Sequence, residues 1–189
     1  MTTKLRAASF QDASIPTAKL EQGSSFLTSV TNADLPAGAI LQHLQTGAIS
    51  EVVASSNQGT WQDSNFTLAI TPSATSSRIF VHVSFPLQLK TSGTKLRGSL
   101  RINRAISGGA TTLIWNTDSY LEQFHTRDAG GTPDEANTMA NVHFIDSPST
   151  TSATTYTVQM VIKNDSGAVQ VWQHRSSYGG ALILQEIKG

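Results

Sequence analysis

The sequence predicts an all-β protein: an antiparallel β-sandwich of jelly-roll type with about ten strands and an extended N-terminal arm. Three observations carry this prediction. Short runs of alternating apolar and polar residues recur from residue 36 onward, Gly, Ser, Asn and Pro separate them, and helix signals are nearly absent. Period-two alternation puts one side of each strand on a core and the other on a polar surface.

The expected strands are flanked by turn residues, and several of them alternate cleanly. In the run Ser77–Phe85, Ile79, Val81 and Val83 fall on one face. Tyr156 and Val158 do the same in a later run. The full set is Ala39–Gln45, Ser50–Ala54, Phe66–Ile70, Ser77–Phe85, Lys95–Arg104, Thr111–Asn116, Met139–Asp146, Thr154–Lys163, Ala168–His174 and Gly180–Ile187.

The connections between these runs are of two kinds. Ser107–Gly109 and Asn164–Gly167 are short turns in which glycine can adopt a positive φ. The connection Thr117–Thr138 is longer than loops usually are. Because binding residues concentrate on such loops, we expect functional contacts there.

The N-terminal segment has a different composition from the rest. Its apolar residues are too sparse to close a core, and Pro16 suits the first position of a short helical turn. We therefore divide the chain into an attachment or oligomerisation arm, residues 1–35, and a sandwich head domain, residues 36–189. The candidate attachment residues of the arm are Ile15, Pro16, Leu20, Phe26 and Leu27.

Composition excludes several classes of function. Thirteen Lys and Arg residues balance thirteen Asp and Glu residues, which argues against nucleic-acid binding because phosphates demand an excess of cations. The chain has no cysteine, so disulfides and thiolate metal sites are excluded. No apolar run approaches the roughly 18 residues of a membrane span, so we expect no membrane insertion.

Catalytic and metal patterns are also missing. The five histidines, His43, His82, His125, His143 and His174, lack metal-ligand spacing, although cross-strand pairing could bring His82, His143 and His174 together. The connection Thr117–Thr138 is rich in carboxylates, which a glycosidase or a calcium site would need, but it has no calcium-loop pattern, and a polar surface loop is expected. No nucleophile elbow or phosphate loop occurs. We expect no enzyme activity, no cofactor and no metal.

Aromatic residues near the long connection suggest a binding site. Trp115, Tyr120, Phe124, His125 and Asp128 are the candidate residues for receptor or glycan binding, since aromatic side chains at a loop rim can stack on sugars. The alternative is that Trp115 and Phe124 pack the loop onto the sandwich.

The polar faces of the expected strands suggest contacts between subunits. Arg97, Arg101, His82, Gln159, Gln170 and Gln173 lie opposite apolar sets, and Ser and Thr together make up about a quarter of the chain. Weakly charged faces rich in hydroxyl groups suit burial against a second subunit. Trp61 and Trp172 are expected in the core or in such contacts.

Several ordered motifs resemble a C-terminal β-domain of phage tail-fibre-like proteins. They are Leu35-Pro36-Ala37-Gly38-Ala39-Ile40-Leu41-Gln42, Thr71-Pro72-Ser73-Ala74-Thr75-Ser76-Ser77, the segment from Asp146-Ser147-Pro148 to Thr155-Tyr156, and the closing LILQEIKG. Ser14–Leu20 is similar to the short units that precede fibre heads. The resemblance covers roughly residues 14–189 and rests on structural motifs rather than catalytic ones.

This resemblance implies a phage virion protein, assembled in the host cytoplasm, with a homotrimeric β-sandwich head. The arm would attach it to other tail or capsid proteins, and its loops would contact the host surface, in particular glycan. Because only about 35 residues precede the head, a capsid decoration protein is the alternative. A polysaccharide depolymerase that uses Asp128, Asp134 and Glu135, and a free carbohydrate-binding module, are further alternatives.

Overall fold

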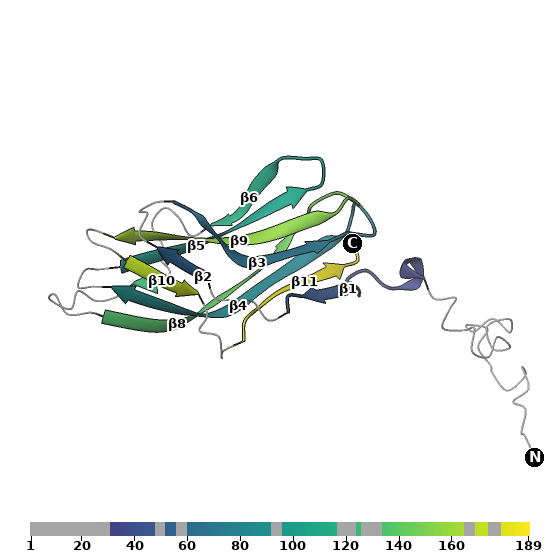
Figure 1. Cartoon of the computed structure of the whole chain (residues 1–189). Coiled ribbons are helices and arrows are strands. Elements are labelled where there is room, and N and C mark those ends of the chain that lie inside the picture. Colours follow the sequence, from purple (N-terminus) through teal and green to yellow (C-terminus); the bar gives the residue numbers. More distant parts are fainter. Residues whose placement is uncertain are drawn as a thin grey trace, which may run out of the picture.

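The computed structural model consists of two antiparallel β-sheets packed face to face (Figure 1). It describes residues 31–47, 52–55, 60–91, 96–116, 124–125, 134–164, 169–173 and 179–189. The elements are η3 (Asn32–Asp34), β1 (Ile40–Gln45), β2 (Val52–Ser55), β3 (Gln62–Ile70), β4 (Arg78–Thr91), β5 (Leu96–Ile106), β6 (Thr111–Asn116), β7 (Phe124–His125), β8 (Asp134–Asp146), β9 (Thr154–Asn164), β10 (Val169–Gln173) and β11 (Ala181–Ile187). The expected all-β sandwich is confirmed.

The first sheet, which we call sheet A, is organised around β4. On one side of β4, β11 pairs with its first half, from Arg78 to Ser84, and β10 pairs with its second half, from Leu87 to Thr91. β1 extends this side beyond β11, and β2 extends it beyond β10. β8 lies along the other side of β4 over nearly its whole length. Among the described strands β8 pairs with β4 alone, so it is an edge strand.

The second sheet, sheet B, has the order β3-β9-β5-β6, with β7 also paired with β5. The turn from β5 to β6 contains Gly108 at φ 77°, a backbone conformation that side chains with a Cβ adopt rarely. β3 contains an irregularity between Asp63 and Thr67, where Asn65 has a positive φ of 61°. Both features lie in sheet B, away from the long pairing of β4 with β8.

The hydrophobic core fills the space between the two sheets. Its largest fully buried side chains include Tyr156, Phe66 and Phe85, and the rings of Phe66 and Phe85 stack with centroids 4.8 Å apart. A Cβ on Gly180 would lie 2.6 Å from the Cβ of Phe85, so only glycine fits where the chain enters β11. The apolar residues predicted to share a face in β4 and β9 are among those buried here.

Two expectations about the connections need correction. β8 begins at Asp134, so the connection that starts at Thr117 does not reach Thr138. Asp134 and Glu135 pair with Thr91 and Lys90 of β4 and belong to a strand, not to a polar loop. This part of the strand was not predicted because the first four residues of β8 are Asp, Glu, Ala and Asn, residue types that are depleted in β-strands. The pairing with the long strand β4 overrides that local preference.

Residues 31–35, which the sequence analysis placed in the arm, contact the sandwich. The Nζ atom of Lys188 donates hydrogen bonds to the carbonyl oxygens of Ala33 and Leu35. The backbone of Lys188 also bonds to Gly38 and Ala39. The end of β11 therefore holds η3 and the entry into β1.

Candidate functional site

Three of the residues predicted to bind a receptor or glycan are described at least in part. Trp115 lies in β6, pairs with Ile102 of β5 and packs, half-buried, against the core. This position agrees with the alternative in which Trp115 packs onto the sandwich. Phe124 and His125 form β7 and pair with Gly98 and Arg97. Tyr120 and Asp128 lie outside the described residues.

The predicted attachment residues are not described either. Ile15, Pro16, Leu20, Phe26 and Leu27 all lie in residues 1–30, outside the described ranges. Of the predicted strand-face residues, Arg97, Gln170 and Gln173 lie in strands, but their side chains are not described. These assignments therefore remain predictions.

Strand pairing brings two of the histidines together. His82 of β4 pairs with His143 of β8, and their rings lie 6.4 Å apart in an edge-on arrangement. His82 Nε2 lies 3.2 Å from Asn141 Oδ1. His174 is outside the described residues. Among the residues that the structure describes, no group of three metal-ligating side chains is close enough to hold an ion.

A buried carboxylate joins three of the sequence motifs. Glu186 is 0 % exposed, and its Oε1 accepts hydrogen bonds from Ser73 N (2.6 Å), Ser73 Oγ (2.6 Å) and Ser77 Oγ (2.7 Å). Its Oε2 accepts from Gln42 Nε2 at 2.7 Å, and the same Nε2 atom donates to the Thr71 carbonyl oxygen. Burial raises the pKa of Glu186, but these hydrogen bonds lower it more, so the pKa lies below its ordinary value. The carboxylate is therefore held ionised.

A second carboxylate links the two sheets. Asp146, at the end of β8, accepts hydrogen bonds from Arg104 Nη1 at 2.7 and 2.8 Å and from the Tyr156 hydroxyl at 2.7 Å. Arg104 belongs to β5 and Tyr156 to β9, so this cluster connects sheet A with sheet B. Burial, together with the bond to Asp146, raises the pKa of Tyr156. The phenol is therefore held neutral, as a hydrogen-bond donor.

Both clusters are structural. Every carboxylate oxygen in them accepts a hydrogen bond from the protein itself, so the two carboxylates hold separate strands and segments together. The motifs are visible in the sequence, but the partners of Glu186, Asp146 and Arg104 are not. In the sequence, the only indication of these contacts is that carboxylate and hydroxyl residues recur within the motifs. The register between strands is needed to show which of these side chains form hydrogen bonds.

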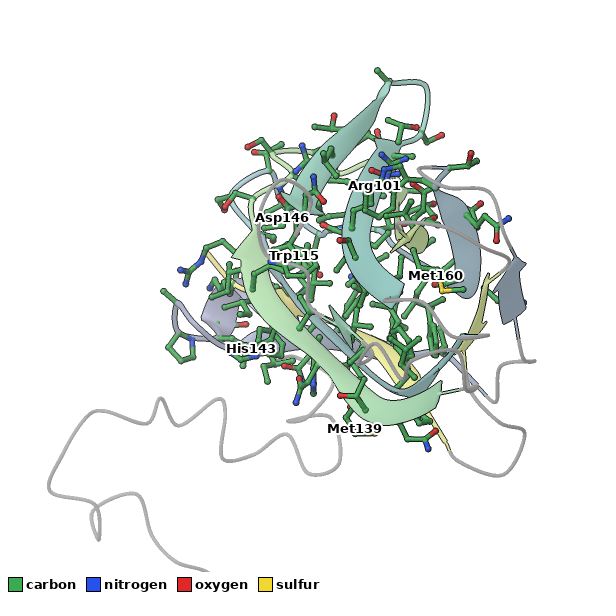
Figure 2. All side chains as sticks on the ribbon, turned by 90° about the vertical axis from the view of Figure 1, so that its left-hand side faces the viewer. Arg101, Trp115, Met139, His143, Asp146 and Met160 are labelled. Carbon is green, nitrogen blue, oxygen red and sulfur yellow. The ribbon has the colours of Figure 1, made fainter. Side chains whose placement is uncertain are left out.

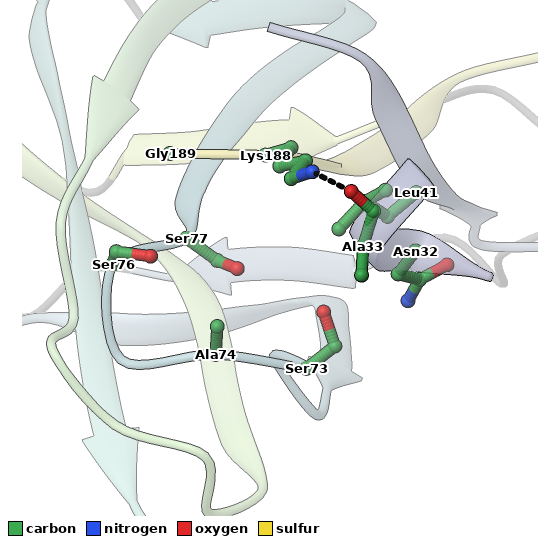
Figure 3. Close-up of a pocket in the computed structure, with 9 residues that line it drawn as sticks. All are labelled: Asn32, Ala33, Leu41, Ser73, Ala74, Ser76, Ser77, Lys188 and Gly189. Atoms are coloured by element: carbon green, nitrogen blue, oxygen red, sulfur yellow. Dashed lines mark hydrogen bonds between the residues drawn. The ribbon is translucent and has the colours of Figure 1, made fainter. Parts of the chain in front are cut away.

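A small cavity of about 240 Å³ lies beside the Glu186 cluster (Figure 3). Its walls come from η3, β1, the Thr71–Ser77 segment and the end of the chain, and they include Ala33, Leu41, Ser76 and Lys188. The Lys188 ammonium group is turned to the carbonyl oxygens of Ala33 and Leu35. The cavity is thus lined by groups that hold these segments together, not by a reactive group.

Three of the four large exposed hydrophobic side chains among the described residues belong to sheet A. Ile40, Met139 and Ile145 are 56 %, 56 % and 53 % exposed, and all three lie on strands of sheet A. Among the described residues the remaining large exposed hydrophobic side chain is Leu113 of β6, in sheet B, at 48 %. In Figure 2, Met139 and His143 lie on the outer side of β8, and Met160 lies in the interior.

We call the side chains that point away from sheet B on β1, β11, β4 and β8 the outer face of sheet A. Strand register places them in rows: His82 lies between Ile183 and His143, and Phe80 lies between Gln185 and Ile145. The apolar members are Ile40, Phe80, Pro86, Met139, Ala181, Ile183, Ile187 and Ile145. Arg78 is the one formally charged residue among the described side chains of this face.

The outer face of sheet B has a different chemistry. Gln159 Oε1 accepts hydrogen bonds from Arg101 Nε at 2.6 Å and Asn103 Nδ2 at 2.8 Å, and Gln159 Nε2 donates to Asp63. The guanidinium of Arg101 lies 4.3 Å from the centre of a Trp61 ring, a cation–π distance. This face satisfies its own polar groups, as a water-exposed sheet surface does.

Comparisons with known proteins identify no family. No protein-family model matches the chain, and no curated protein matches it. Two similar solved structures are those of infectious bursal disease virus, strain Gx (13 % identity, TM-score 0.43) and strain Gt (12 %, 0.44), each covering 80 % of this chain and 38 % of that chain. A third, the VP2 subviral particle of the same virus, is 13 % identical, with 78 % and 37 % covered and a TM-score of 0.37.

This chain therefore spans less than two fifths of the length of those viral chains. Likenesses at these scores do not show a shared function. No helix in the described part of the chain is long and apolar enough to cross a membrane.

Proposed function

We propose that the protein is a non-enzymatic structural component of a phage virion, a short tail-fibre-like homotrimeric head attached through residues 1–35. The arrangement of its sequence motifs supports this proposal. Three of the motifs that resemble fibre heads meet at Glu186, although Gln42 and Glu186 are 144 residues apart in sequence, and a fourth supplies both Asp146 and Tyr156. The fold thus brings residues of three separate motifs together around one buried carboxylate.

The chemistry of the described residues is consistent with this role. The carboxylates of the two clusters are saturated by hydrogen bonds, and the outer face of sheet A presents apolar groups with little charge. A protein whose role is to assemble with other subunits needs surfaces that can pack against them, and it needs no reactive group. Contact with host glycan through the loops is part of the proposal and rests on the sequence resemblance.

The first test is the mass of the purified protein in solution. Light scattering coupled to size-exclusion chromatography should give three times the chain mass of 20.2 kDa. A single-chain mass at all concentrations would contradict the trimeric head. The second test is immunogold labelling of purified virus particles with antibodies raised against the chain; unlabelled particles would contradict the virion assignment.

The capsid decoration role is distinguished by the phenotype of particles that lack the protein. A tail-fibre-like protein is needed for adsorption to cells, so its loss should abolish adsorption and leave the heat tolerance of the particle unchanged. A decoration protein stabilises neighbouring coat subunits, so its loss should lower heat tolerance and leave adsorption intact. Gold label on the tail of the particle would support the fibre role, and gold label on the capsid would support the decoration role.

A further inference from the structure

We propose that residues 31–47, which comprise η3 and β1, form a strap that detaches from the sandwich while the two sheets stay folded. The strap connects the sandwich to residues 1–30, which the proposed function assigns to attachment, so this inference rests on that function. Detached and extended, a stretch of this length spans roughly 55 Å. Opening of the strap would therefore let the sandwich move relative to its point of attachment.

The strap contributes no buried residue to the sandwich. None of residues 31–47 is buried, and Ile40 is 56 % exposed. Leu44 is the member of the strap that packs, partly buried, against the core. Because burial of apolar surface is the main stabilising contribution to a fold, the strap is held much less strongly than the strands that line the core.

β1 lies at the edge of sheet A, beside β11 (Figure 1). Among the described strands it pairs with β11 alone, and that pairing is irregular between Ile40 and Gln42. On its other side β11 pairs with β4 from Arg78 to Ser84. Detachment of β1 therefore leaves β11 held in the sheet.

The strap is also incompletely packed against the sandwich. The cavity of about 240 Å³ is lined on one side by Asn32, Ala33 and Leu41 of the strap and on the other by the Ser73–Ser77 segment (Figure 3). Side chains that line a cavity lack van der Waals partners on that side. This part of the contact therefore contributes little packing energy.

Polar contacts with the end of β11 keep the strap closed. The Nζ atom of Lys188 donates hydrogen bonds to the carbonyl oxygens of Ala33 and Leu35. Gln42 Nε2 donates to the ionised Glu186 at 2.7 Å. Hydrogen bonds in which one partner is charged are stronger than neutral ones. We call Lys188 and Gln42 the latch, because their hydrogen bonds hold a segment that apolar burial holds only weakly.

Hydrogen exchange of the full-length protein tests whether the strap opens on its own. We expect the amide protons of β1 to exchange at least about 100-fold faster, relative to their intrinsic rates, than those of β9, an interior strand of sheet B. Low concentrations of urea should accelerate exchange in β9 and leave exchange in β1 nearly unchanged, because opening of the strap exposes little surface. The same protection, or the same urea dependence, in the two strands would overturn the inference.

Two glutamines of β1 provide a matched pair of variants for the latch. Gln42→Leu removes the hydrogen bond to Glu186, whereas Gln45→Leu changes an exposed side chain of the same strand. We expect Gln42→Leu and Lys188→Met to accelerate exchange in β1 at least about tenfold, and Gln45→Leu to change it less than about threefold. Equal rates in Gln42→Leu and Gln45→Leu would overturn the assignment of the latch.

The absence of cysteine permits a disulfide lock across the same strands. His43 and Gln185 lie opposite each other in register, with His43 Nδ1 3.1 Å from Gln185 Nε2. Directly opposed residues of an antiparallel pair have Cα separations that a disulfide can bridge. In the double variant His43→Cys/Gln185→Cys, we expect the oxidised protein to exchange its β1 amide protons at least about tenfold more slowly than the reduced protein. Equal rates in the two forms would overturn the inference.

Failure of the strap and failure of the proposed function are distinguishable. Hydrogen exchange is measured on the purified chain and does not require that particles carry it. Equal protection of β1 and β9 in a protein whose antibodies label particles would overturn the strap alone. Unlabelled particles, together with independent exchange of β1, would overturn the virion role alone.

Discussion

Arg104 Nη1 lies 2.7 and 2.8 Å from the two carboxylate oxygens of Asp146, and this ion pair connects the two sheets of the sandwich. Both side chains are largely buried, with 16 % and 11 % of their surfaces exposed. Arg104 Nε has no hydrogen-bond partner among the described residues. The two buried charges are therefore stabilised mainly by each other and by the hydrogen bond from the Tyr156 hydroxyl.

Removal of one member of this pair should destabilise the fold strongly. Asp146→Ala leaves the Arg104 guanidinium buried without a counter-charge, and we expect a loss of about 3 kcal/mol in the free energy of unfolding. Arg101→Ala is the control, because Arg101 lies on the outer face of sheet B, and its loss should cost about 1 kcal/mol or less. Urea denaturation of both variants measures the difference, and equal losses would contradict the structural role of Asp146.

The Tyr156 hydroxyl should make stability fall in alkaline solution. Because burial raises its pKa, the folded state keeps its proton where the unfolded phenol, with an ordinary pKa of about 10, loses it. This contribution is present below about pH 10 and is lost as the pH rises further. Tyr156→Phe should cost about 1 kcal/mol at neutral pH through the lost hydrogen bond. Above pH 10 the melting temperature of Tyr156→Phe should then fall less steeply with pH than that of the wild type. Equal slopes for the two proteins would contradict the prediction.

Glu186 should contribute stability that is lost in acid. Its pKa lies below the ordinary value, so its contribution is present above the unfolded carboxyl pKa of about 4.3 and disappears as the pH falls through the folded value. We expect Glu186→Gln to be less stable at pH 7 by about 1–3 kcal/mol and to show a smaller drop between pH 7 and acid conditions. Asp63→Asn, which removes an exposed carboxylate from sheet B, is the matched control. Thermal melts across pH test both variants.

Trp115 should affect stability through its packing. Its ring is half-buried against the core, so Trp115→Ala should lower the free energy of unfolding by about 2 kcal/mol. Leu113→Ala on the same strand is the control, with an expected change within about 0.5 kcal/mol because the side chain is exposed. If Trp115→Ala left stability unchanged and removed binding on a glycan array, Trp115 would be a ligand contact instead.

Local pattern in the sequence was sufficient to predict most strands and which of their faces is buried. The alternation of Ile79, Val81, Val83 and Phe85 predicts a strand with one buried face, and all four are buried in β4. The glycines after Ser107 predict the turn between β5 and β6. These features depend on neighbouring residues, whose spacing can be read directly.

Contacts between distant residues were decided by the tertiary structure. The pairing of His82 with His143, the hydrogen bonds of Glu186 with Ser73, and the ion pair between the sheets depend on strand register and on how the sheets pack. A shift of one residue in any strand would turn its side chains to the other face. For this reason the sequence determined which residues face inward, and only the folded sandwich decided which polar groups are buried together and which apolar residues remain on its surface.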